Sequence, residues 1–362
     1  IIDDSVNVIQ ENLKRFAGIF NGNNLAIRGL KIDSNKDYQG LFGFQAGNVE
    51  NLIIKNSYIK GNSSVGAIAG LNTGVIFNCK VINTEVVGDS KVGGLVGNSS
   101  TGSKILTCDV EGIKALVKGS EYVGGAVGYT NNNVVLENLT NNSKVEAEKF
   151  VGGISGISFY GTTLMSSKNN GRIIGSENVG GLIGYSQAQI EKSYVSDISV
   201  VEGNINVGGL VGLNHSAGDL SNSYNKGKVI GNKDIIGGLV GTNNSNISNC
   251  YNTGRVDARK TSGLRVGGIC GQNMSDSFIT SVYNIGDVLY NESAEGIVGI
   301  DYGTTSNAYY LDSIHALAPA HKHFPIILDL IVCTPPWHNQ LSYKLNYLYH
   351  PYYSFVSCQF ST

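Results

Sequence analysis

Short apolar segments recur along the chain at a nearly constant spacing, and glycine interrupts each of them. The most regular is a six-residue unit, of which Val207–Gly212 (Val-Gly-Gly-Leu-Val-Gly) is a typical copy. Its copies start 27 to 31 residues apart, at Tyr38, Val65, Val92, Val123, Val151, Val179, Val207, Ile236, Val266 and Ala294. A fixed period of this length indicates a repeat architecture in which every repeat is one supersecondary unit.

A second recurring pattern follows the unit after about fourteen residues. Asn222–Val229, Asn249–Val256 and Ser281–Val288 share a small residue, a tyrosine, an asparagine and, two positions later, a glycine. An aliphatic residue lies three positions before the small one, at Ile76, Ile105, Ile190, Leu220, Ile247 and Ile279. Short β-branched segments separated by Gly, Asn and Ser predict strands joined by turns. Helical repeats would need longer stretches of 3.6-residue periodicity with few glycines, which the sequence lacks.

One such repeat leaves its apolar side exposed, so successive repeats are expected to stack. The pattern therefore predicts an all-β solenoid of about ten rungs, roughly 45–50 Å long at a strand spacing of about 4.8 Å. A column of leucines would fill the interior, formed by Leu41, Leu95, Leu182, Leu210 and Leu239. The sequence does not decide which face of the unit points inward. Val207 and Val211 share one strand face, Leu210 lies on the other, and both faces are apolar.

Composition divides the chain into unlike parts. The 48 glycines greatly exceed the usual share of about 7%, and all of them lie at or before Gly303. All five prolines, the only tryptophan and five of the six histidines come after it. We predict an N-terminal lead-in or capping segment at 1–37, the solenoid at 38–311, and an atypical tail at 312–362. The tail is either foreign or out-of-frame sequence, or a small cap.

Charge and hydropathy exclude two classes of function. With a net charge of −2 and 15% charged residues, the chain has no basic footprint for nucleic acid. Nor does any apolar run reach the length of a transmembrane helix. The sequence begins at Ile1 with neither a Met nor a leader peptide, so we expect it to be a piece of a longer protein whose export must be inferred.

The repeats resemble the GLUG family, named for a Gly-Leu-hydrophobic-Gly core. Gly94–Gly97, Gly181–Gly184, Gly209–Gly212 and Gly238–Gly241 match this core fully, and other copies vary at Ala67, Ala126, Ser155 and Cys270. The resemblance extends over roughly residues 14–311. It implies a right-handed parallel β-helix with 27–31 residues per rung. It further implies a place in secreted or wall-attached bacterial proteins, such as adhesin-like proteins and the non-catalytic N-terminal region of immunoglobulin-A-specific metallopeptidases. No catalytic residue is implied.

No motif for catalysis or cofactor binding is present, and we expect neither. The sequence has no His-Glu-x-x-His metallopeptidase motif and no phosphate-binding loop. Acidic residues recur two or three positions before the unit, at Asp89, Glu121, Glu148, Glu177 and Asp234. We interpret them as solvated turn residues. A stripe that binds calcium weakly and a catalytic carboxylate pair on neighbouring rungs are the alternatives.

Histidines provide little support for a site. His215 is the only histidine of the repeat region and is interpreted as a surface loop residue. In the tail, His321, His323, Cys333 and His338 match no zinc-ligand spacing, so chance clustering is preferred to a metal site.

Cysteines occupy a column of the repeat. Cys79, Cys108 and Cys250 alternate there with Ser193 and Ser223, which predicts a slot for a small buried side chain. Cys79 and Cys108 fall on adjacent rungs, within the range of a disulfide. Side chains in such a column point in parallel, so free thiols are favoured over a bridge. Cys270 is expected in the core.

A tyrosine column is the one candidate binding feature. It consists of Tyr194, Tyr224, Tyr251 and Tyr283, and asparagines follow three of them, at Asn225, Asn252 and Asn284. If the tyrosines face outward, they form a ladder suited to a glycan or protein; if they face inward, they are core.

Three functions follow from these patterns. The first is a non-catalytic structural or adhesive surface module, extracellular or cell-surface, that binds an unidentified protein or glycan without a cofactor. The second is the non-catalytic arm of a secreted zinc metallopeptidase. The third is a carbohydrate-active β-helix enzyme, which would need clustered acidic and basic side chains on one rung face.

Overall fold

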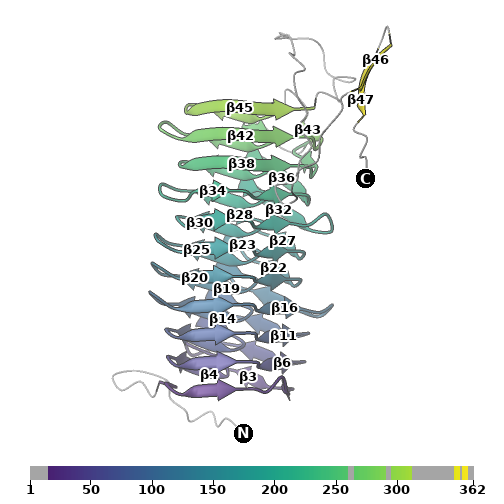
Figure 1. Ribbon diagram of the computed structural model, residues 1–362. Helices are drawn as coiled ribbons and strands as arrows, with labels where there is room; N and C mark the ends of the chain where they lie inside the picture. The colour runs from purple at the N-terminus through teal and green to yellow at the C-terminus, as the bar shows by residue number, and fades with distance from the viewer. Residues whose placement is uncertain (1–14, 260–264, 291–294, 312–345, 351–352, 358–362) are drawn as a thin grey trace. The chain divides into compact units, whose positions relative to one another are not determined.

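The computed structural model describes residues 15–259, 265–290, 295–311, 346–350 and 353–357. All regular secondary structure within these ranges is β, and the strands between residues 19 and 310 pair only in parallel. Three sheets run along the stack, so that each turn of the chain lies on the one before it (Figure 1). The predicted all-β solenoid of stacked parallel rungs is confirmed.

The ten-stranded sheet contributes one strand to each rung, which sets the number of rungs at ten. Its strands are β4 (Phe42–Gln45), β9 (Ala69–Asn72), β14 (Val96–Ser99), β19 (Val127–Thr130), β24 (Ser155–Ser158), β29 (Ile183–Ser186), β33 (Val211–Asn214), β37 (Val240–Asn243), β41 (Cys270–Asn273) and β44 (Val298–Asp301).

The 19-stranded sheet lies on a second side of the solenoid, and most rungs contribute two short strands to it. Its strands are β1 (Ile19–Asn21), β2 (Ala26–Arg28), β5 (Asn48–Glu50), β6 (Ile53–Lys55), β10 (Val75–Phe77), β11 (Lys80–Ile82), β15 (Lys104–Leu106), β16 (Asp109–Glu111), β20 (Val135–Glu137), β21 (Thr140–Asn141), β25 (Thr163–Met165), β26 (Lys168–Asn169), β30 (Gln189–Glu191), β31 (Tyr194–Val195), β34 (Leu220–Ser221), β35 (Tyr224–Asn225), β38 (Asn246–Asn252), β42 (Phe278–Asn284) and β45 (Thr304–Tyr310).

The 16-stranded sheet forms the third side. Its strands are β3 (Lys31–Asp33), β7 (Tyr58–Lys60), β8 (Ser63–Gly66), β12 (Glu85–Val87), β13 (Ser90–Gly93), β17 (Leu116–Lys118), β18 (Glu121–Gly124), β22 (Lys144–Glu146), β23 (Lys149–Gly152), β27 (Arg172–Ile174), β28 (Glu177–Gly180), β32 (Val200–Gly208), β36 (Lys228–Gly237), β39 (Val256–Asp257), β40 (Val266–Gly267) and β43 (Val288–Leu289).

Equivalent residues of successive repeats lie directly above one another. Val207 pairs with Val179 on the preceding rung and with Ile236 on the following one, and all three are fully buried. In the predicted leucine column, Leu95, Leu182, Leu210 and Leu239 are fully buried, whereas Leu41 is partly buried against the same core. The core is therefore a set of continuous apolar columns.

The structure resolves which face of the six-residue unit is interior. Val207, Leu210 and Val211 are all fully buried, although simple strand alternation would expose one face. The chain turns between the end of β32 at Gly208 and the start of β33 at Val211. Because the direction changes at this corner, both apolar sets point into the core.

Crowding between rungs explains the second glycine of the unit. A Cβ atom on Gly209 would lie 2.1 Å from the carbonyl oxygen of Gly238 and 2.4 Å from Nδ2 of Asn225. Real Cβ contacts are not that short, so Gly209 has no room for a side chain, although Ala67 fills the equivalent position of the second copy. The space is shared by the backbone of the next rung and a buried amide side chain.

Buried asparagine side chains link the rungs through the core. Asn225 Nδ2 donates to Asn252 Oδ1 over 2.9 Å, and Asn252 Nδ2 donates to Asn284 Oδ1 over 2.9 Å. Asn252 also bonds both backbone polar groups of Gly254, and its side chain is fully buried. Each amide thereby forms hydrogen bonds both to its own turn and to the neighbouring rung. These bonds offset the free-energy cost of burying the polar group.

A second amide column runs along the end of the ten-stranded sheet. Asn214 bonds Asn243, Asn243 bonds Asn273, and Asn273 bonds Asp301, with donor–acceptor distances of 2.8–2.9 Å. The three asparagines are fully buried, so this column is also part of the interior.

Each rung bends within the 19-stranded sheet, at a residue whose backbone has a left-handed conformation. One residue per repeat has φ between 48° and 57°, at Asn51, Asn78, Thr107, Asn138, Ser166, Lys192, Asn222, Asn249, Ser281 and Asn307. Asparagine tolerates this conformation better than most residues do, which explains its recurrence. Asn78 Nδ2 also donates to Asn51 Oδ1 over 2.7 Å across the rungs.

The two ends of the chain differ from the repeats. In the lead-in, β1, β2 and β3 pair with β5, β6 and β7 of the first rung. The chain divides into two units, Ile1–Ala318 and Pro319–Thr362. In the second unit β46 (Asn346–His350) and β47 (Tyr353–Ser357) form an antiparallel pair. The residues around the boundary expected at 311/312 lie partly outside the described ranges, so that boundary stays a prediction.

Candidate functional site

The four tyrosines of the predicted column form a continuous stack on the outer surface. Adjacent ring centroids from Tyr194 to Tyr283 are 4.9, 4.8 and 4.8 Å apart, and the ring planes are within 10° of parallel. Within β38, Cys250 and Asn252 on either side of Tyr251 are buried, so strand alternation directs the tyrosine outward. The rings therefore face outward, and the register continues the column to Tyr309.

Partial burial in the stack affects the phenol groups. Desolvation raises the pKa of Tyr224 to about 12, with a further contribution from the neighbouring Tyr251 and Tyr194. It likewise raises the pKa of Tyr251 to about 12, with Tyr283 contributing. Lys226 lies with Nζ 5.2 Å from the centre of the Tyr224 ring. The hydroxyl groups of Tyr224 and Tyr251 therefore stay protonated over the whole physiological pH range.

Alkaline titration is expected to reveal the stack. Because the folded pKa values of Tyr224 and Tyr251 lie above the ordinary value near 10, the stability they contribute is fully present below pH about 10 and is lost as the pH rises toward 12. Phenolate absorbance should show late-ionising tyrosines that the Tyr224→Phe/Tyr251→Phe double variant lacks. If the difference between the two proteins develops around pH 10 instead, the rings are not stacked and desolvated as described.

The acidic residues that precede the units do not form one stripe. In the register of the 16-stranded sheet, Lys149 lies between Glu121 and Glu177, and its Nζ is 3.7 Å from a Glu177 carboxylate oxygen. Ile205 separates Glu177 from Asp234, which is held by Arg265. The acidic stripe considered from the sequence is therefore interrupted by a cation and an apolar residue.

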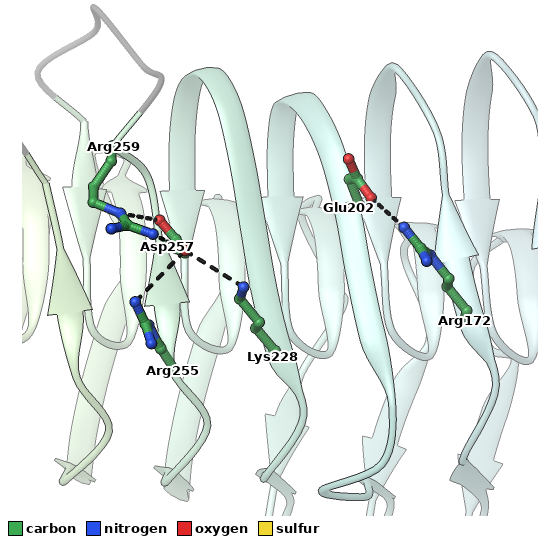
Figure 2. A network of polar contacts seen from close by, with 6 residues as sticks. All are labelled: Arg172, Glu202, Lys228, Arg255, Asp257 and Arg259. Carbon is green, nitrogen blue, oxygen red and sulfur yellow. Dashed lines mark hydrogen bonds and ion pairs between the residues drawn. The ribbon is translucent and has the colours of Figure 1, made fainter.

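Two ion pairs that cross from one rung to the next lie on the same sheet and were not recognised in the sequence. Arg172 reaches Glu202 on the next rung over 2.8 Å, and Lys228 reaches Asp257 on the next rung over 3.4 Å (Figure 2). In the register of the sheet, Ile230 lies between Glu202 and Asp257, and Leu289 follows Asp257. These diagonal ion pairs tie consecutive rungs together.

Among the carboxylates of the described residues, Asp257 is the one whose pKa is clearly shifted. Arg259, Lys228 and Arg255 all approach it, with Arg259 Nε at 2.8 Å (Figure 2). The hydrogen bond from Arg259 is the main reason that its pKa falls to about 2, with Lys228 assisting against desolvation. The stability it contributes is present above pH about 4 and is lost as the pH falls toward 2. Its role is structural, since its oxygens are taken up by these cations.

The four cysteines in the described ranges are free thiols. Cys79 and Cys108 are buried on adjacent rungs, and the amide N–H of Cys79 donates to Cys108 Sγ over 3.3 Å. Burial raises the pKa of Cys108 well above its usual value. Cys270 is buried in the core as expected, and Cys250 is buried in the same column as Cys79.

The column that holds these cysteines is a hydrogen-bonding position. Ser167, Ser193 and Ser223 each donate to the carbonyl two residues earlier, and Ser193 and Ser223 each accept the amide N–H of the preceding rung's column residue. Size alone does not define the slot, because register also places Leu139 in it. In the sequence, this position could be recognised by the repeated exchange of Ser and Cys. Both side chains supply an atom that accepts a hydrogen bond from a backbone N–H group.

A second aromatic cluster was missed in the sequence. It joins Tyr122, Tyr129, Phe150, Phe159, Tyr185 and His215, with ring centroids 5.1–6.3 Å apart. His215 stacks on Tyr185 and lies 3.3 Å from Gln187 Nε2 through Nδ1, consistent with a loop residue. These rings come from different columns of the repeat, so no single periodic position marks them.

The described residues contain neither a cluster of potential metal ligands nor a membrane-spanning helix. Across the described ranges, no three His, Cys, Asp or Glu side chains gather so as to hold a metal ion. The tail residues His321, His323, Cys333 and His338 lie outside those ranges. The described part of the chain also has no helix of sufficient length and apolar character to span a membrane.

Comparison with known protein families identifies two of the repeats. Residues 203–230 and 235–257 match the family model for the GLUG motif. The matched segments include Tyr224 and Tyr251 of the stack and two copies of the six-residue unit. The chain matches no curated protein and no solved structure. Residues 203–257 therefore contain two GLUG repeats, in agreement with the resemblance of the sequence to that family.

Proposed function

We propose that the chain is a non-catalytic structural and adhesive module that binds an extracellular protein or glycan. The binding surface would be its lateral face, by which we mean the outer side of the 19-stranded sheet that carries the tyrosine stack. The outward tyrosine stack carries this proposal. Tyrosine supplies contact area and a hydroxyl group at little cost in side-chain entropy, and it is enriched in recognition surfaces. Stacking already orders the rings, so little further ordering accompanies binding.

The parallel stack also supports a structural role. Ten rungs joined by backbone ladders, amide columns and diagonal ion pairs form a stiff body that holds a binding face away from its point of attachment. We place this module outside the cell or on its surface. Neither the metallopeptidase arm nor the carbohydrate-active enzyme gains a specific observation among the described residues.

Ligand screening of the full chain tests the proposal. The protein would be presented with soluble polysaccharides, immobilised glycans and immunoglobulin, and both binding and release of products would be measured. We expect binding without product release, and Tyr251→Ala should weaken it about tenfold or more because a central ring is lost.

The matched control is Tyr160→Ala, at a loop tyrosine that is 63% exposed and outside the stack. It should leave binding unchanged, and thermal unfolding would show that both variants keep their fold. Release of sugar or peptide fragments that a single Asp or Glu substitution abolishes would overturn the non-catalytic proposal.

A further inference from the structure

We infer that the ligand of the lateral face is an uncharged, hydroxyl-rich polysaccharide, and that it binds across the last three rungs. This inference rests on the proposed binding role of that face. The surface concerned is the outer side of β38, β42 and β45, which lie next to one another at the C-terminal end of the stack (Figure 1). We call it the uncharged face.

Its composition differs from that of the earlier rungs of the same sheet, up to β30/β31. None of the residues in Asn246–Asn252, Phe278–Asn284 and Thr304–Tyr310 is charged. By contrast, each of the six strand pairs from β5/β6 to β30/β31 carries at least one charge, for example Lys80 in β11 and Glu137 in β20. The change from charged to uncharged therefore coincides with the region where the tyrosines stack.

The outward groups repeat in register from rung to rung. Ser248, Thr280 and Ser306 form a column of hydroxyl groups, and Ser306 Oγ donates to Thr280 Oγ1 over 3.3 Å. The tyrosine column lies beside it, with Tyr251 and Tyr283 rings 4.8 Å apart. A polymer of identical units laid along the solenoid would meet the same donors and acceptors at every rung.

The orientation of the rings defines how such a polymer is held. Because Tyr251 stacks between Tyr224 and Tyr283, its two faces are covered and it presents its edge and hydroxyl group outward. Recognition is then by hydrogen bonds from phenol, alcohol and amide groups, with ring edges adding apolar contact. Tyr283, which is 39% exposed, is the ring of the stack most open to solvent.

The absence of charge in these strands discriminates between ligand classes. Phosphate, sulfate and carboxylate groups are bound mainly by Arg and Lys, and the three strands supply neither. An anionic polymer would lose hydration there without gaining an ion pair. An uncharged polysaccharide exchanges hydrogen bonds with water for equivalent ones with the protein, so its chemistry fits.

Matched pairs of polymers test the inference on the full chain. Dextran would be compared with dextran sulfate, and hydroxyethylcellulose with carboxymethylcellulose, by affinity electrophoresis. We expect at least one uncharged polymer to bind about tenfold more tightly than its charged partner. Raising the salt concentration from about 0.1 to 1 M should leave this binding unchanged, since no ion pair is involved.

Two glutamate substitutions in the same column localise the binding. Thr280→Glu places a carboxylate in the centre of the uncharged face and should weaken binding about tenfold or more. Met165→Glu, in β25 of the same register column, is the control and should have no effect. Tyr283→Phe removes only the hydroxyl group and should weaken binding about threefold to tenfold. Thermal unfolding would verify that each variant is folded.

The outcomes separate this inference from the proposed function. Binding that prefers the charged polymers, or that Thr280→Glu leaves unchanged, overturns the inference. Capture of a protein ligand alone also overturns it but leaves the adhesive function standing. Failure of every polymer and protein to bind overturns both.

Discussion

Replacing Asn252 with aspartate is expected to destabilise the solenoid by about 3–5 kcal/mol at neutral pH, the range for an uncompensated buried charge. The amide of Asn252 donates to Gly254 O and to Asn284 Oδ1, and both are acceptors only. A carboxylate in its place would face these two oxygens with no proton to share. Urea unfolding followed by circular dichroism would measure the loss.

Asn249→Asp is the control for that substitution. Asn249 lies three residues earlier in the same strand, is exposed, and has φ of 53°, which aspartate also tolerates. Its effect should stay within about 0.5 kcal/mol, as for most surface changes. Equal destabilisation by the two variants would show that the amide column is not a buried network.

Replacing Gly209 with alanine should be as damaging, although it adds only one methyl group. The new Cβ would lie 2.1 Å from Gly238 O and 2.4 Å from Asn225 Nδ2, so both the strand spacing and the amide column must shift. Overpacking of this kind costs about 3 kcal/mol, and occasionally more when the opposing atoms are backbone. Hydrogen exchange should show lost protection in the rungs on both sides.

Gly18→Ala provides the comparison. A Cβ atom there would contact only the Phe16 ring, at 3.4 Å, and the residue is exposed. Its effect should lie within about 1 kcal/mol and be neutral or stabilising, because alanine reduces the freedom of the unfolded chain. A mild effect of Gly209→Ala, equal to that of Gly18→Ala, would contradict the close packing of the rungs.

The period of the sequence was sufficient to predict the fold because a solenoid repeats its core. Once Val179, Val207 and Ile236 are placed one period apart, stacking alone puts them in contact. The corner at Gly209 was harder to predict, because alternation in a strand gives no sign of where the strand bends. Both apolar faces of the unit turned out to be interior for that reason.

The tyrosine column could be recognised in the sequence, but its orientation could not. Tyr251 and Asn252 are neighbours that look equally able to face solvent, and only the structure shows the amide inside and the ring outside. The amide can be buried because Asn225, Asn284 and the Gly254 turn satisfy it, and those contacts come from three repeats. The acidic stripe failed for a related reason, since offsets of one residue decide which column a side chain joins.

The amide column that begins at Asn214 has a direction. At each link the N–H of one rung donates to the oxygen of the next, so the side-chain dipoles align along the axis and reinforce one another. Asn214 Oδ1, at the start, is a buried atom without a hydrogen-bond partner among the described residues. At the other end Asp301 accepts from Asn273 but, as a carboxylate, has no proton to pass on. Asp301 therefore ends this column of hydrogen bonds. Extending the column to another rung would first require asparagine in place of Asp301.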